Sequence, residues 1–373
     1  MKKFLLVPDS FKGTLSSKQI CSIMKERIAF HFPDAQAIEI PVADGGEGSV
    51  DCFLSATNGE KVWCETVNPF FEKMQGYYGL LNGGKIAVIE MAVCAGLPLV
   101  EDRKDPMKAT TYGVGLLIKD AVERGVKEII LGLGGSATND FGCGAVSALG
   151  VDFYDEKGNA FIPTGQTLQN VSKIEKDKDL LSGINITLMC DVKNFLYGKN
   201  GAAYIYAPQK GANSEQVKIL DEGLKHICAI ASRDLAKDVS NLVGAGAAGG
   251  MAGGMSAFFD AQIKMGIEVV LDTVGFDKLL KDADVVFTGE GKIDSQSLQG
   301  KVVSGVAKRA KERKVPVIAV VGGIDGDISS IYDNGINSVF AINCLPEDFS
   351  VSRYKSKENL NKTMDNVLRI LKM

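Results

Sequence analysis

The chain has 373 residues, a net charge of −4 and a hydrophobic fraction of 45%. Domains commonly run to ~100–200 residues, so this length predicts two domains, each with its own core. The near balance of 42 basic and 46 acidic residues argues against a nucleic-acid or anionic-membrane surface, which would need basic clusters.

Cysteine and histidine usage bears on metal binding and on redox setting. The eight cysteines form no CxxC pair and the chain has only two histidines, which argues against a zinc site. Scattered cysteines in apolar segments are typical of reduced thiols, so we expect a cytoplasmic protein. The first apolar run stops at Pro8 and Asp9, too early for a signal peptide or a membrane span.

In chain order, short β-rich runs alternate with amphipathic helices, the pattern of an α/β protein with a mainly parallel sheet. Residues 3–7 predict the first strand, and residues 16–30 predict a helix with its apolar side chains on one face. Ser16 and Gln19 have the spacing of a capping box at the start of this helix.

The remaining elements continue the alternation. Strands are predicted at 37–42, 86–91, 129–131, 186–191, 284–287, 315–321 and 337–343, and helices at 111–125, 302–313 and 358–373. The first strand and the last strand–helix–strand unit predict one Rossmann-like domain from residues 1–65 and 270–373. Residues 66–269 predict a second α/β domain inserted into it, and the strand at 129–131 fits either domain.

The loops after the predicted strands have similar compositions: each contains glycine or a small hydroxyl residue together with an acid, a lysine or both. They are "PDSFKGTLSS", "PVADGGEGSVD", "GLGGSATND", "CDVKN", "TGEGKID" and "GGIDGD". In an open α/β sheet, ligands bind at the carboxyl ends of the strands. Glycine-rich loops bind phosphate through backbone N–H groups, carboxylates hold Mg²⁺, and lysines neutralise phosphoryl charge. The combination therefore predicts phosphoryl transfer.

Other interpretations of the same residues stay open at this point. No segment matches the Walker A pattern, whereas Gly132, Gly134 and Ala137 fit G-x-G-x-x-A, with Asp152 about 20 residues further on, as in a dinucleotide fingerprint. The segment "GAGAAG" at 244–249 fits G-x-G-x-x-G. Each single aspartate that follows a strand could equally cap a helix or close a turn.

Seven segments together resemble the bacterial glycerate kinase family, of the type that is neither a Walker A kinase nor a ribokinase. They are "VPDSFKGTLSS", "PVADGGEGSVD", "EMAVCAGLPLV", "LGLGGSATNDFGCG", "CDVKNFLYG", "GAGAAGGMAGGM" and "VFTGEGKIDSQSLQGKVVSGVA", in matching order from about Pro8 to Gly323. The resemblance implies phosphorylation of D-glycerate with ATP and Mg²⁺, and two domains with a cleft between them, one of them Rossmann- or flavodoxin-like. Its members are generally associated with 2-phosphoglycerate rather than 3-phosphoglycerate.

The loop chemistry suggests a role for each charged candidate. Lys12 suits the substrate carboxylate, Asp191 is our choice to accept the proton of the attacking hydroxyl, and Lys292 would steady the γ-phosphate. Asp44 would hold Mg²⁺, with Glu290 or Asp294 as alternatives.

The loop from Gly132 to Thr138 is predicted to bind the ATP phosphates through Gly132, Gly134, Gly135, Ser136 and Thr138. A side chain at Gly134 or Gly135 would then occupy the space through which phosphate approaches. An NAD-dependent hydroxy-acid dehydrogenase and a non-catalytic nucleotide sensor are the competing functions. The sequence leaves a homodimer open and does not identify the hydroxyl that is phosphorylated.

Overall fold

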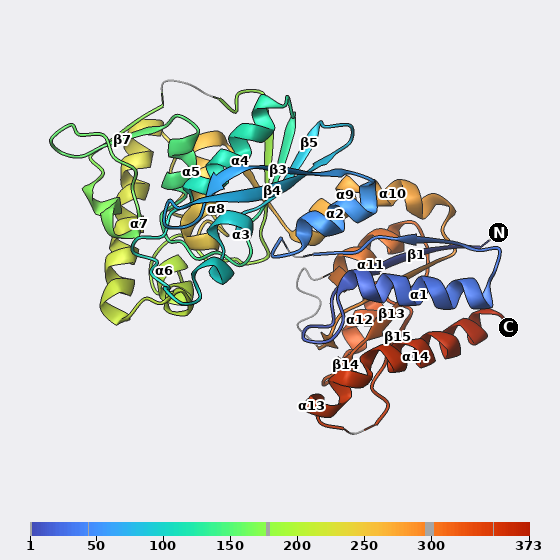
Figure 1. The fold of residues 1–373 in the computed structure, drawn as a ribbon. Coiled ribbons are helices and arrows are strands. Elements are labelled where there is room, and N and C mark those ends of the chain that lie inside the picture. The colour runs from blue at the N-terminus through green and yellow to red at the C-terminus, as the bar shows by residue number, and fades with distance from the viewer. Residues whose placement is uncertain (1, 44, 177–179, 295–301, 346) are drawn as a thin grey trace. The chain divides into compact units, whose positions relative to one another are not determined.

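The computed structural model describes residues 2–43, 45–176, 180–294, 302–345 and 347–373 (Figure 1). Contacts between residues divide the chain into two compact units. Unit 1 comprises Met1–Ala43, Ser55–Thr57 and Ile267–Met373, and unit 2 comprises Asp44–Leu54 and Asn58–Gly266. The domain boundaries near 65 and 270 stay a prediction.

Unit 1 contains an all-parallel sheet of five strands, as the alternating pattern predicts. The strand order is β15-β13-β11-β1-β2. The strands are β1 (Lys3–Pro8), β2 (Gln36–Glu39), β11 (Val285–Gly289), β13 (Val317–Val321) and β15 (Ser338–Ala341). Strand β1 pairs with β2 and β11, so segments from both ends of the chain meet in the middle of the sheet.

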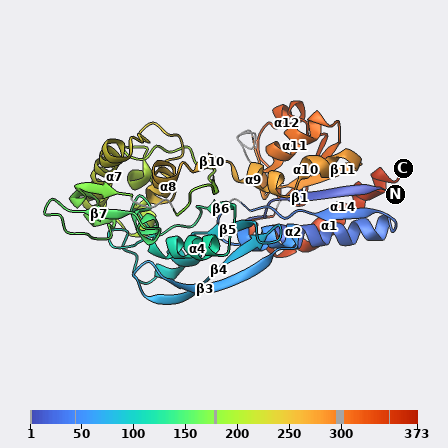
Figure 2. The same ribbon diagram turned by 90° about the horizontal axis from the view of Figure 1, so that it is seen from above.

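Helices cover both faces of this sheet (Figure 2). Helices α1 (Ser17–His31) and α14 (Ser356–Leu371) pack together over the face that carries Phe4 and Leu6, whereas α11 (Val302–Glu312) contacts β1, β11 and β13. The predicted capping box is present at Ser16 and Gln19. Shorter elements complete the unit: α9 (Gly266–Thr273), α10 (Phe276–Leu279), β12 (Lys292–Ile293), β14 (Gly323–Ile324), α12 (Ser329–Asp333) and α13 (Phe349–Ser352).

Unit 2 contains a mixed sheet of six strands in the order β10-β9-β6-β5-β4-β3. The strands are β3 (Glu60–Val67), β4 (Lys73–Leu81), β5 (Ile86–Glu90), β6 (Glu128–Gly132), β9 (Asn185–Met189) and β10 (Gln262–Lys264). The β3–β4 and β4–β5 pairs are antiparallel and the others parallel. The strand predicted at 129–131 therefore lies in this second sheet. Strands β7 (Asp152–Tyr154) and β8 (Lys173–Glu175) form a separate pair.

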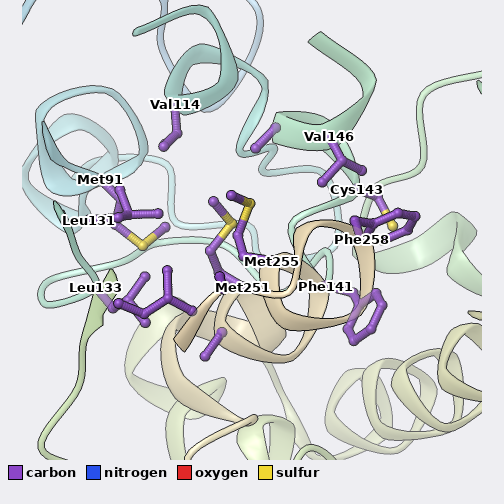
Figure 3. Packing of buried hydrophobic residues seen from close by; sticks show 14 of the residues in the cluster. Met91, Val114, Leu131, Leu133, Phe141, Cys143, Val146, Met251, Met255 and Phe258 are labelled. Atoms are coloured by element: carbon purple, nitrogen blue, oxygen red, sulfur yellow. The ribbon is translucent and has the colours of Figure 1, made fainter. Parts of the chain in front are cut away.

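Several helices lie wholly or partly in unit 2, which also has a large apolar core. They are α2 (Ser49–Thr57), α3 (Ala92–Ala95), α4 (Tyr112–Glu123), α5 (Cys143–Ala148), α6 (Ala202–Tyr206), α7 (Ser214–Leu235) and α8 (Met251–Phe259). Figure 3 shows Met251 and Met255 of α8 in the middle of this core, with Leu131 on one side and Phe141 and Phe258 on the other. Flexible methionine side chains fill such irregular space well. Within the described residues, no helix combines the length and apolar character that crossing a bilayer requires.

Candidate active site

A pocket of about 220 Å³ lies in unit 2, where β6 and β9 end. Parallel strands place the loops that follow them at the same edge of a sheet, which is where ligands bind in α/β proteins. The polar part of its lining comes from the loop after β6, the segment after β9 and the helical segments near residue 210: Gly134, Gly135, Ser136, Asp191, Tyr206, Gln209 and Lys210. Four predicted site residues, Gly134, Gly135, Ser136 and Asp191, are thus brought together.

The glycines at the start of the loop are required by a neighbouring backbone segment. A Cβ at Gly132 would lie 2.5 Å from Gly45 O, and one at Gly134 would lie 2.5 Å from Gly46 Cα. The Gly134 N–H also donates to Gly45 O at 3.0 Å. We expected that Gly134 lacks a side chain because phosphate must approach there. That reason is wrong, because protein backbone already fills the position that a side chain would take.

Gly135 and Ser136 are better placed to bind an anion. Gly135 has φ +72°, a left-handed conformation that favours glycine, and both residues line the pocket. Neither backbone N–H has a hydrogen-bond acceptor among the residues that the structure describes. Two adjacent unbonded amides at a pocket wall are suitable donors for a phosphate or carboxylate oxygen.

The helix that follows the loop already has a carboxylate at its start. Buried Asp140 accepts hydrogen bonds from the amides of Gly142 and Gly144 in the first turn of α5, and from the amide and hydroxyl of Thr111. Burial raises the pKa of the Asp140 carboxyl above its usual range. The N-terminus of α5 is thus occupied by the protein's own acid, and any phosphate in the pocket relies on the loop amides instead.

Lys210 is a pocket residue that the sequence analysis did not select. It is the last residue of a short 3₁₀ helix, η3 (Pro208–Lys210), and its side chain is buried. Its Nζ donates to Ser136 Oγ at 2.8 Å and to Thr138 O at 2.7 Å. Burial lowers the pKa of Lys210 to about 7, although nearby Asp140 acts in the opposite direction. No signal in "APQKGAN" links it to the loop, since the contact spans 74 positions of sequence.

The same loop holds buried polar atoms that lack partners. Thr138 Oγ1 and both polar atoms of the Asn139 side chain have no hydrogen bond among the described residues. Each such group costs about 1–3 kcal/mol unless water or a ligand satisfies it. Thr138 is fully buried and is not among the residues that line the pocket, and its contact with phosphate stays a prediction.

The second glycine-rich segment supports this loop from behind. A Cβ at Gly249, in the 3₁₀ helix η4 (Ala247–Gly250), would collide with Thr138 O, and one at Gly254 in α8 would collide with Phe141 O. These small residues let η4 and α8 pack against the loop backbone. Neither glycine-rich segment forms the strand–turn–helix of a dinucleotide fingerprint, because η4 follows no strand and helix α5 begins only at Cys143.

Asp191 lies two residues beyond the end of β9, whereas the sequence predicted a strand ending on it. It lines the pocket, and its Oδ1 accepts a hydrogen bond at 2.8 Å from the amide of Gly266, which begins α9 and is the last residue of unit 2. The residue therefore combines a capping contact with exposure to the pocket.

Four of the other predicted residues belong to unit 1. They are Lys12, Glu290, Lys292 and Asp294, whereas Asp44 lies outside the described residues. Lys12 is exposed, and Lys292 Nζ forms an ion pair with Asp325 Oδ2 at 2.5 Å that raises the pKa of the lysine. Within the described part of the chain, no group of three or more His, Cys, Asp or Glu side chains is placed to hold a metal ion.

Glu90 is a second buried charged residue near the site that the sequence analysis did not select. It ends β5, is buried, and accepts hydrogen bonds from the amides of Gly48 and Val50 at the start of α2. Burial raises the pKa of its carboxyl. Through these bonds Glu90 fixes the segment that follows Gly45 and Gly46, which in turn pack against the loop after β6.

Unbonded amides, a buried lysine and a carboxylate at the carboxyl edge of parallel strands are the groups that phosphoryl transfer uses. The fold and the pocket thus define a phosphotransferase of the α/β class. The profile of the glycerate kinase family matches residues 4–372, and the chain belongs to that family of kinases, which use ATP. The predicted resemblance and the prediction of a kinase are both confirmed.

Individual relatives agree with this assignment over nearly the whole chain. A glycerate kinase of Haemophilus influenzae is 43% identical over 372 residues, covering 99% of this chain and 98% of the relative. A glycerate 2-kinase of Escherichia coli is 40% identical over 348 residues, covering 91% and 90%. The crystal structure of a Salmonella typhimurium LT2 protein, described provisionally as glycerate kinase 2, has a TM-score of 0.88 at 40% identity and covers 100% of this chain and 98% of that one.

Proposed function

We propose that this chain transfers the γ-phosphoryl group of ATP to the 2-hydroxyl of D-glycerate, giving 2-phosphoglycerate and ADP. Family membership supports glycerate as the substrate, and the Escherichia coli relative named glycerate 2-kinase supports the position. The observation that carries the proposal is the pocket itself, in which the amides of Gly135 and Ser136, unbonded among the described residues, lie with Asp191.

The strand order of the sheet in unit 1 supports a flavodoxin-like fold for this unit. Numbered along the chain within that sheet, the strands run 2-1-3-4-5, the order of flavodoxin-like doubly wound folds. We propose that unit 1 is a flavodoxin-like domain and that unit 2 is a second α/β domain inserted into it.

The residues of the pocket fit the phosphate part of ATP. The amides of Gly135 and Ser136 would donate to phosphate oxygens and withdraw charge from the group that is transferred. Asp191 would accept the proton of the substrate hydroxyl as that oxygen attacks phosphorus. Its bond to Gly266 would hold the carboxylate in a fixed orientation. ATP supplies the phosphoryl group, and the loop supplies its position.

The charged residues of unit 1, together with Asp44, complete the proposal. Mg²⁺ would be held by Asp44, with Glu290 or Asp294 as alternatives, since this metal commonly takes one or two carboxylates together with phosphate oxygens and water. Lys12 would bind the substrate carboxylate and Lys292 the γ-phosphate. We further propose a cytoplasmic protein, in keeping with eight cysteines that form no disulfide among the described residues, and leave a homodimer to measurement.

Phosphorus NMR of the product tests reaction and position together. With D-glycerate, ATP and Mg²⁺, the product phosphorus should be split into a doublet by the single proton on C2. A triplet would indicate phosphorylation at C3, where two protons couple, and would refute the proposed position. No new phosphate ester, with ATP unchanged, would refute the reaction. L-Glycerate under the same conditions is the matched control for the substrate.

A further inference from the structure

Lys210 is a buried lysine that forms no ion pair among the described residues. Its two hydrogen bonds go to neutral oxygens, Ser136 Oγ and Thr138 O. Asp140 is close enough to influence it, but the Asp140 oxygens already accept four hydrogen bonds from α5 and Thr111. A buried ammonium needs a counter-charge or loses its proton.

The surroundings of Lys210 leave room for a bound anion. The pocket that Lys210 lines also carries Gly135 and Ser136, whose amides are unbonded within the described residues. The titratable groups around it, taken from every neighbouring element, are Asp140 in the loop after β6, Cys190 and Asp191 after β9, Tyr206 at the end of α6, and Lys104 next to Gly211. Burial raises the pKa values of the Cys190 thiol and the Tyr206 hydroxyl, so both are neutral near pH 7.

We propose that Lys210 is the cationic receptor for an oxyanion in this pocket, and that it binds this anion in its protonated form. The inference rests on the proposed function, which supplies two sources of one chemistry: the carboxylate of glycerate and the phosphates of the nucleotide. Lys210 would hold the anion from one side while the amides of Gly135 and Ser136 donate from the loop. The bond from Lys210 to Ser136 Oγ ties these groups into one receptor.

Binding should then be coupled to proton uptake. In the free protein, burial brings the pKa of Lys210 to about 7, so above this pH most molecules carry neutral Lys210. An oxyanion beside the amine favours the charged form and raises its pKa. Binding at about pH 8 should therefore take up close to one proton per site, and binding at about pH 6 should take up close to none.

Isothermal titration calorimetry in two amine buffers of different ionisation enthalpy measures this uptake. One arm titrates D-glycerate and the other ADP, so the arm that shows uptake at about pH 8 identifies the source of the anion. The variant Lys210→Met should abolish the uptake and weaken that ligand about 10–100-fold, the range for a lost charged hydrogen bond. Lys210→Arg keeps a permanent charge and should bind without uptake. Exposed Lys199, outside the pocket lining, provides the control variant Lys199→Met, which should keep the wild-type uptake.

Absence of pH-dependent uptake in both arms with the wild-type protein would overturn the proposal, and this outcome does not depend on any variant folding. Unchanged affinity of folded Lys210→Met for both ligands would also overturn it. Lys210 would then have only a structural role, through its hydrogen bonds to the loop. Failure of the proposed function is seen separately, as absence of turnover of D-glycerate with ATP by the wild-type protein.

Discussion

Replacing Gly134 with alanine separates two explanations for the missing side chain. An ideal Cβ at this position would lie 2.5 Å from Gly46 Cα and 2.8 Å from Gly46 N. Both atoms are backbone, so one segment must move away from the other. That movement would lengthen the 3.0 Å hydrogen bond from Gly134 N to Gly45 O.

The size of the effect follows from three contributions. Forcing an extra methyl group into packed structure costs about 1–3 kcal/mol. A weakened hydrogen bond adds up to about 0.5–1.5 kcal/mol. Alanine also lowers the entropy of the unfolded chain, which offsets roughly 0.4–1 kcal/mol. We therefore expect a net destabilisation of about 1–3 kcal/mol, or a fall in Tm of roughly 2–12 °C for a unit of this size.

Differential scanning calorimetry of wild type and Gly134→Ala measures this fall. Gly323→Ala is the matched control, because a Cβ there meets no atom within 4 Å and its backbone is not left-handed. The control should keep the wild-type Tm or exceed it slightly, since only the entropy contribution remains. A folded Gly134→Ala protein with the wild-type Tm and a raised KM for ATP would refute the packing argument, because the methyl group would then lie in ligand space.

Three further predictions concern charge. Asp191→Asn keeps an oxygen for the Gly266 amide, so Tm should hold while kcat falls about 10²–10⁴-fold. If Asp191 only caps α9, kcat should stay at the wild-type value, whereas recovery of the rate with added Mg²⁺ would make Asp191 a metal ligand. Asp44→Asn should lower turnover strongly in a folded protein, because an amide carries no charge to hold Mg²⁺, and wild-type turnover would end that metal assignment. Since the pKa of Lys210 is about 7 in the folded protein and higher in the unfolded chain, Lys210 should make stability rise with pH above 7, by up to ~1.4 kcal/mol per pH unit. Measurements of Tm at several pH values should show a weaker rise in Lys210→Met than in wild type, and an identical profile in both proteins would contradict this prediction.

Local sequence determined most elements of the parallel sheets and the helices around them. The capping box at Ser16 and Gln19 begins α1 because its two hydrogen bonds connect residues three apart. The stripe of Leu360, Met364, Val367 and Leu368 is buried in α14 because a helix returns to the same face every three to four residues. Strands β3 and β4 were not predicted, and they form an antiparallel edge of the second sheet.

The loop sequences that follow the strands also located part of the site. Residues that follow parallel strands share one edge of a sheet, so the loop after β6 and Asp191 after β9 meet in one pocket. The division of the remaining candidates between two units, with Lys12 and Lys292 in unit 1, was decided by the tertiary structure. Strand ends are visible in a sequence, but the sheet to which each strand belongs depends on pairing across long separations.

Tertiary structure alone decided what the glycines and the buried charges do. Gly134 lacks a side chain because Gly46 lies against it, and Gly249 because Thr138 does, neither of which is written in the local sequence. Lys210 looks like an ordinary loop lysine until the fold buries it against Ser136, 74 positions away. Burial changes the pKa of a charged group, and burial is a property of all the chain packed around it. The sequence therefore determined the chemical groups, and the fold determined which of them are desolvated in the pocket.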